Sequence, residues 1–204
     1  SYAELEALKV SLGLDKPIVV RYFLWLWDFL HGDLGTSYRT SQSVALMIGQ
    51  RIGPSLMLTG TGILCAILIG VPLGILSAYK PNSIWDNIGS FISFIGASVP
   101  NFFLSLLMIY VLAVKLHLFP TSGMYTSGAV QSTGDLLRHL FMPAFVCGIQ
   151  PIGNYIKQTR SSVLDVLNEE YIKTARSKGL TNTVIVLKHA FRNALIPVVT
   201  TISL

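Results

Sequence analysis

One uncharged run constrains this chain more than any other feature of its sequence. Ser55–Tyr79, SLMLTGTGILCAILIGVPLGILSAY, holds 25 residues without a charged side chain. The hydrocarbon core of a bilayer is about 30 Å thick and is crossed by roughly 20 helical residues, so this run can span it with some tilt. Only 12% of the chain is charged, about half the share that is typical of soluble domains. We therefore expect an all-α transmembrane protein.

The small residues of this run favour a packed bundle over an isolated helix. Glycines lower the stability of a soluble helix, but in a membrane they let neighbouring helices approach closely. Gly70 and Gly74 are four residues apart, so they share one face of the helix. We expect that face to contact another helix.

Further apolar stretches predict additional spans. Ile88–Val114 is uncharged over 27 residues, Leu140–Ile156 over 17, and Ala194–Leu204 over 11. The last two are short for a crossing. We interpret Leu140–Ile156 as a bent helix that continues as an amphipathic helix, and Ala194–Leu204 as a truncated span. The bundle is expected to be a fragment that lacks its first and last spans.

The second of these stretches contains a proline at a position that bears on transport. Pro100 has no backbone N–H and should kink or break the helix. Polar Ser98 and Asn101 flank it, and at this depth they could line a translocation path. The alternative is that both side chains make hydrogen bonds between helices.

The N-terminal quarter differs from the rest of the chain. We expect residues 1–53 to form an extracytoplasmic segment and residues 54–204 the transmembrane domain. Within the first, Ile18–Leu30 is too short and too charged to cross a bilayer. Its Tyr22, Trp25 and Trp27 suit a membrane interface, so it is either an interfacial helix or a packed cap.

Basic residues indicate the orientation of the spans. Four spans place the Lys80–Asn87 turn and the Lys157–Asn193 loop on the same side, and these two short segments hold eight Lys and Arg residues. The other side holds seven over a much longer length, mixed with acidic residues. Because short cytoplasmic loops are enriched in basic residues, we expect residues 157–193 to form a cytoplasmic loop of a multi-pass protein of the cell membrane.

This loop has the pattern of two helices joined by a glycine turn. Asn168 is expected to cap a helix that begins at Glu169, and Gly179 to end it in the left-handed conformation. Thr181 is expected to begin the second helix. Three interpretations remain open: a surface hairpin, a DNA-binding helix-turn-helix, and a docking element for a cytoplasmic partner. Membrane spans only a few residues away on both sides argue against DNA.

Motifs for catalysis and metal binding are lacking in the sequence. There is no Gly-x-x-x-x-Gly-Lys-Ser/Thr phosphate loop, and the four histidines are scattered. Cys65 and Cys147 lie in apolar runs and are interpreted as small hydrophobic residues. We therefore expect no catalytic residue, metal site or cofactor. The spans carry no ionisable residue at mid-membrane, which disfavours ion-driven transport.

The sequence resembles a known family over essentially its whole length. EEYIKTARSKGL (Glu169–Leu180) with the following KHAFRNALIPVVT (Lys188–Thr200) resembles the cytoplasmic loop of permease subunits of ABC importers. Leu12–Val44, Arg51–Ala78, SVPNFF and LRHLFMPAF resemble the oligopeptide/dipeptide branch, which includes nickel permeases. The likeness is to the first of the two permeases that such systems pair. The chain differs from the general importer motif in having Lys173 at the position of its Glu.

The resemblance implies a fold, partners and a docking site. The fold would be a type I ABC importer-like helical bundle. The partners would be a second permease subunit, cytoplasmic ATP-binding subunits that hydrolyse ATP, an extracytoplasmic substrate-binding protein and membrane lipid, with no nucleic acid. The substrates would be oligopeptides or dipeptides; nickel import and an ATP-independent channel or secondary transporter are the alternatives. The implied ATPase-docking residues are Glu170, Tyr171, Ile172, Ala175, Arg176, Lys178 and Gly179, with an apolar contact face at Tyr171, Ile172 and Ala175.

Overall fold

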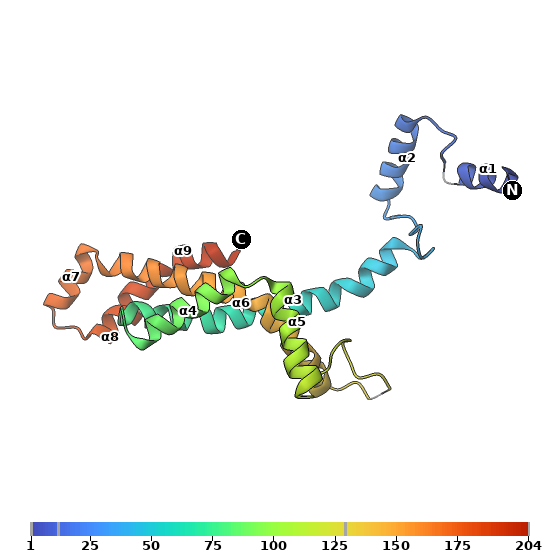
Figure 1. The fold of residues 1–204 in the computed structure, drawn as a ribbon. Helices are drawn as coiled ribbons and strands as arrows, with labels where there is room; N and C mark the ends of the chain where they lie inside the picture. Colours follow the sequence, from blue (N-terminus) through green and yellow to red (C-terminus); the bar gives the residue numbers. More distant parts are fainter. Residues whose placement is uncertain (1, 12, 129, 204) are drawn as a thin grey trace. The chain divides into compact units, whose positions relative to one another are not determined.

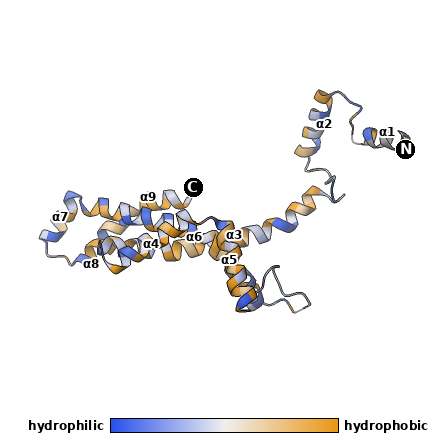
Figure 2. Cartoon of the chain, in the orientation of Figure 1, coloured by the Kyte–Doolittle hydropathy of each residue, from blue (hydrophilic) through white to orange (hydrophobic). Residues whose placement is uncertain are grey.

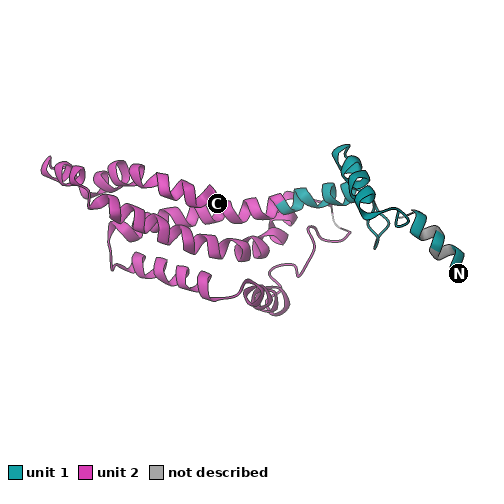
Figure 3. Cartoon of the chain, turned by 90° about the horizontal axis from the view of Figure 1, so that it is seen from above, with its two compact units in different colours: residues 1–55 teal, residues 56–204 magenta. Residues whose placement is uncertain are grey.

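The described part of the chain is helical. The computed structural model describes residues 2–11, 13–128 and 130–203, and within them the one β-type contact is an isolated bridge between Thr36 and Ser43. Residues 1–55 and 56–204 form two compact units, which are described separately (Figure 3). The helices, shown in Figure 1, are α1 (Tyr2–Ser11), α2 (Ile18–Leu30), α3 (Val44–Tyr79), α4 (Ile84–Ser98), α5 (Asn101–Met108), η1 (Ile109–Lys115, a π-helix), α6 (Thr133–Leu167), α7 (Glu170–Ser177), α8 (Asn182–Val184), η2 (Ile185–Ala190, a π-helix) and α9 (Phe191–Ser203).

The first unit contains a helix where the sequence predicted either an interfacial helix or a packed cap. α2 covers the predicted residues Ile18–Leu30, and none of its side chains is buried. Its aromatic rings form a row along one side: Tyr22 lies 6.1 Å from Trp25, and Trp25 stacks on Phe29 at 5.5 Å. A row of exposed aromatic rings fits the predicted membrane interface, and that location stays a prediction.

In the second unit, α6 is packed between other helices. α4 packs on it between Ile149 and Arg160, and α9 contacts it as well. α3 meets it through a buried cluster of Ala66, Ile152, Tyr155 and Ile156. The helix is continuous over 35 residues although it contains two prolines. This confirms that Leu140–Ile156 continues as helix beyond Lys157, and it adds two helical turns before Leu140.

The contacts around α6 are close enough to exclude side chains larger than hydrogen. A Cβ built on Gly74 of α3 would lie 2.7 Å from the Cβ of Thr159, and one on Gly96 of α4 would lie 2.6 Å from the carbonyl oxygen of Ile149. Real Cβ atoms do not approach so closely, so glycine is required at both positions. The expected helix contact at Gly70 and Gly74 is therefore confirmed.

Among the residues that the structure describes, two helices are long and apolar enough to cross a membrane, and α6, where a span was expected at Leu140–Ile156, is not one of them. They are Val44–Tyr79 and the continuous stretch Asn182–Ser203, and a third crossing would be the bent pair Ile84–Ser98 and Asn101–Lys115. The helix expected at Ala194–Leu204 thus begins twelve residues earlier than its uncharged part indicated, because α8, η2 and α9 follow one another without a break. In Figure 2 hydrophobic residues extend along α3 to α6, while hydrophilic residues gather at α7.

The helix break expected at Pro100 is present. α4 ends at Ser98, α5 begins at Asn101, and their axes differ by 103°. The uncharged stretch Ile88–Val114 is therefore a broken helix, because Pro100 takes the extended conformation that precedes α5. Ser98 and Asn101 are both exposed on the two sides of the break.

A bidentate ion pair fixes the start of α4 on α6. Arg160 donates from Nε to Oδ1 of Asp86 at 2.7 Å and from Nη2 to Oδ2 at 2.9 Å. The backbone N–H of Asn82 also donates to this carboxylate at 2.8 Å. Asp86 is 4% exposed, and a buried carboxylate needs such partners to remain charged.

Replacing a close-packed glycine should destabilise the bundle. We expect Gly96→Ala to lower the free energy of unfolding by about 1–3 kcal/mol, because the new methyl group meets backbone that must move. Gly60→Ala is the matched control, since no heavy atom lies within 4 Å of its Cβ position. Stability would be measured by thermal unfolding of the full-length protein in detergent. Equal destabilisation by both variants would contradict the packing.

The Asp86–Arg160 pair should show energetic coupling. In a double-mutant cycle of Asp86→Ala and Arg160→Ala, we expect an interaction of about 1–3 kcal/mol in the free energy of unfolding. The control pair is Glu170 and Lys173, which are exposed on one helix and joined at 2.6 Å. That pair should show no measurable coupling. Additive effects of the Asp86 and Arg160 variants would overturn this prediction.

Candidate functional site: the α7–α8 hairpin

The junction between α6 and α7 is tighter than the sequence indicated. Asn168 has helical dihedral angles, φ −90° and ψ −5°, and ends α6 through backbone hydrogen bonds to Asp165 and Val166. Glu169 is the extended residue that precedes α7, with φ −70° and ψ 149°. The expected cap by Asn168 is therefore wrong, because a capping residue must be extended and Asn168 still belongs to the preceding helix.

The end of α7 follows the predicted pattern. Ser177 is the last residue of α7 and Lys178 is its C-cap. Gly179 then has φ +77°, the left-handed conformation that favours glycine. The N–H of Gly179 donates to the carbonyl of Arg176 at 2.9 Å. The predicted helix was expected to run from Glu169 to Gly179, but α7 stops at Ser177. The residues after Ser177 form the turn that leads to Thr181.

The second arm of the hairpin begins where it was predicted. Thr181 is extended, with φ −68° and ψ 151°, and α8 follows it at Asn182. α8 then passes through η2 into α9. The hairpin therefore connects α6 directly to a helix long enough to cross the membrane.

The apolar face of α7 is turned toward the chain itself. Ile172 is fully buried and Ala175 is 8% exposed, and both lie in a cluster with Ile185 of η2 and Leu167 of α6. The expectation that Ile172 and Ala175 form an apolar face for a partner is thus wrong: residues three apart on a helix share one face, and here that face is already covered. These two side chains hold the hairpin together.

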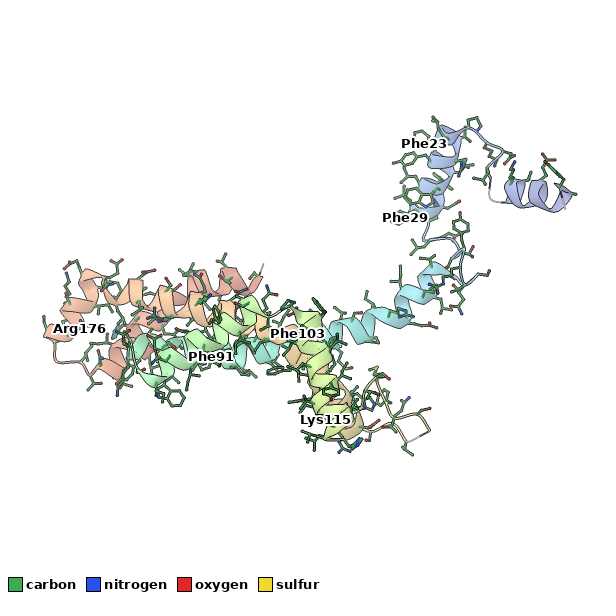
Figure 4. The ribbon with its side chains drawn as sticks, in the orientation of Figure 1. Phe23, Phe29, Phe91, Phe103, Lys115 and Arg176 are labelled. Carbon is green, nitrogen blue, oxygen red and sulfur yellow. The ribbon has the colours of Figure 1, made fainter. Side chains whose placement is uncertain are left out.

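The remaining predicted docking residues are exposed. Tyr171 is 43% exposed, and Glu170, Arg176, Lys178 and Gly179 are exposed as well. Arg176 projects from the side of α7 (Figure 4). The outward face of α7 is consequently polar and carries more basic than acidic groups.

Two hydrogen bonds that involve tyrosine hydroxyls attach the hairpin to longer helices. The Tyr79 hydroxyl at the end of α3 lies 3.2 Å from Oγ1 of Thr183. The amide of Asn193 on α9 donates to the hydroxyl of Tyr171 at 2.7 Å. Sequence reasoning missed both contacts, because nothing local in the sequence pairs residues that are 104 or 22 positions apart.

The other predicted site residues are not part of this hairpin. Ser98 and Asn101 lie at the α4–α5 break, whereas α7 lies at the far end of α6 (Figure 1). Within the described ranges, no group of three or more His, Cys, Asp and Glu side chains could hold a metal ion.

Comparison with known proteins identifies the family of this chain. A family model described as the binding-protein-dependent transport system inner membrane component matches residues 70–204, which include the end of α3, α4 to α9 and the whole hairpin. Among similar curated proteins, a putative peptide permease protein of Brucella suis biovar 1 is 44% identical over 98% of this chain and 63% of its own length. The oligopeptide transport system permease protein AppB of Bacillus subtilis is 40% identical over 98% of this chain and 64% of its own length. The dipeptide transport system permease protein DppB of Alkalihalophilus pseudofirmus is 37% identical, over 97% and 65% respectively.

The chain thus spans less than two thirds of the length of these relatives. The similarity nevertheless extends over nearly all of its own residues, in both compact units. It agrees with the all-helical structure and confirms the resemblance that was drawn from the sequence. The chain belongs to the family of binding-protein-dependent transport system inner membrane components.

Proposed function

We propose that this chain is a membrane-spanning permease subunit of an ATP-driven importer of oligopeptides or dipeptides. The observation that carries the proposal is α7, a short helix with a polar outward face that is held firmly between two long helices. The printed names of the relatives support the substrate class, because they describe peptide, oligopeptide and dipeptide permeases.

The docking face is the exposed side of α7. Glu170, Tyr171, Arg176 and Lys178 contact a cytoplasmic ATP-binding subunit, and Gly179 shapes the turn at the end of the helix. The basic side chains face acidic groups of that subunit, since opposite charges set the orientation of such contacts. Ile172 and Ala175 act from inside the hairpin by keeping α7 attached.

Movement of the ATP-binding subunit reaches the membrane through α7. Only Asn168 and Glu169 separate α7 from α6, so a displacement of α7 is passed to a helix that contacts α4 and α9. A second permease subunit forms the other half of the path, and an extracytoplasmic binding protein delivers the substrate. ATP is hydrolysed in the partner subunit.

The translocation path passes the break between α4 and α5. Pro100 cannot donate to the carbonyl of Gly96, so a backbone acceptor is free of its usual helical partner there. Ser98 and Asn101 add exposed polar side chains on the two sides of the break. Peptides carry many amide groups that need such partners when they leave water.

ATP-driven uptake of peptides tests this function. The full-length chain would be reconstituted in proteoliposomes with its partner subunits and binding protein. We expect labelled dipeptides or oligopeptides to accumulate only when ATP reaches the ATP-binding subunits. Uptake of nickel but not of peptides would establish the metal importer instead. Uptake driven by an ion gradient without ATP would establish a secondary transporter.

Reversal of charge on α7 should weaken docking. We expect the double variant Arg176→Glu, Lys178→Glu to lower affinity for the ATP-binding subunit about tenfold, because attraction across the contact becomes repulsion. Lys157→Glu is the matched control, since Lys157 is an exposed basic residue of α6 outside the hairpin. Association would be measured by copurification and titration in detergent. Equal loss in both variants would mean that α7 is not the docking face.

A further inference from the structure

The bond between Tyr171 and Asn193 joins α7 to α9 at a particular point. The two N–H groups of the Asn193 amide have two acceptors: the Tyr171 hydroxyl at 2.7 Å and the carbonyl of His189 at 3.2 Å. His189 belongs to η2 and Asn193 to the first turn of α9. The same side chain therefore contacts the docking helix and the end of the π-helix.

The helix around Asn193 is less strongly bonded than a regular α-helix. η2 precedes it, and π-helical turns within helices are rare, recur at functional sites and are places where helices kink. Pro197 lies four residues later inside α9 and cannot donate to the carbonyl of Asn193. Kinks in helices occur at such positions, so the segment from His189 to Pro197 is where this long helix bends most readily.

The buried contacts of α7 are with η2 and α6. The buried cluster attaches Ile172 and Ala175 to Ile185 at the start of η2 and to Leu167 of α6. Through the backbone, α7 reaches α9 only by way of the exposed turn at Gly179. The Tyr171–Asn193 contact is a direct connection between α7 and the deformable start of α9.

We propose that Tyr171 and Asn193 are positioning residues that transmit the displacement of α7 to the bend between His189 and Pro197 of the spanning helix. This inference rests on the proposed function of α7 as the ATPase-docking helix. It adds a second route into the membrane beside α6. In this role the Tyr171 hydroxyl acts inside the permease, in addition to any contact of its ring with the partner.

The test is the number of peptides taken up per ATP hydrolysed. In proteoliposomes that hold the complete importer, Tyr171→Phe retains the ring and removes the hydroxyl. We expect uptake per ATP to fall about threefold, the effect of losing roughly one net hydrogen bond. Asn193→Leu should give a similar fall while copurification of the ATP-binding subunit is unchanged, because Asn193 lies outside the docking face. The double variant should be no worse than the poorer single variant, because both remove the Tyr171–Asn193 contact.

Thr200→Val provides the matched control on α9. It also removes an exposed hydroxyl, but that hydroxyl bonds only within its own helix, to the carbonyl of Ile196 at 3.0 Å. Its uptake per ATP should equal that of the wild type. If the wild type couples uptake to ATP and Tyr171→Phe retains the same ratio, the positioning role is overturned and the proposed function stands. A wild type without ATP-driven uptake overturns both.

Discussion

The second unit depends on the close approach of α3 and α4 to α6. Between apolar helices in lipid there is little hydrophobic driving force, so association relies on packing and on hydrogen bonds. Glycine provides both here: Gly153 of α6 lies so close to Ser93 that the serine hydroxyl donates to its carbonyl at 3.0 Å. Because the backbones are in contact, small displacements of one helix cannot be absorbed by side chains between them. This is the property that a helix bundle needs if movement at one end is to reach the other.

The attachment of α7 uses a different chemistry from the rest of the bundle. Its inward side is a small apolar cluster around Ile172, and its outward side is polar. A docking helix with its apolar residues exposed would depend on the partner to keep it in place. With Ile172 and Ala175 buried, α7 keeps its position on α6 and η2 without that partner. In the proposed function, a partner would therefore apply its displacement to a preformed structure.

Local rules explain what could be predicted from the sequence. The bounds of α2, the break at Pro100, the left-handed Gly179 and the start of α8 after Thr181 each depend on a few neighbouring residues. The cap assigned to Asn168 was also inferred from neighbouring residues, and it was wrong by one position. The extended residue that precedes α7 is Glu169. The pattern at Tyr171, Ile172 and Ala175 did indicate an apolar face. It could not indicate whether that face meets a partner or Ile185 of the same chain, because that depends on tertiary packing.

The Asp86–Arg160 pair could not be predicted from the sequence either, and it determines the register of α4 on α6. The two residues are 74 positions apart, and Arg160 alone was indistinguishable from the other basic residues that indicate membrane orientation. Replacing such a pair by apolar residues is often neutral or stabilising, so stability alone does not explain why a chain contains it. A bidentate contact does fix one register, since slipping α4 along α6 by a turn would leave a buried carboxylate without its partner. Arg160 is located between the glycine contacts of α6 and the start of α7. The pair therefore keeps α4 in register with the part of α6 that leads to α7, the part that would move with α7 in the proposed function.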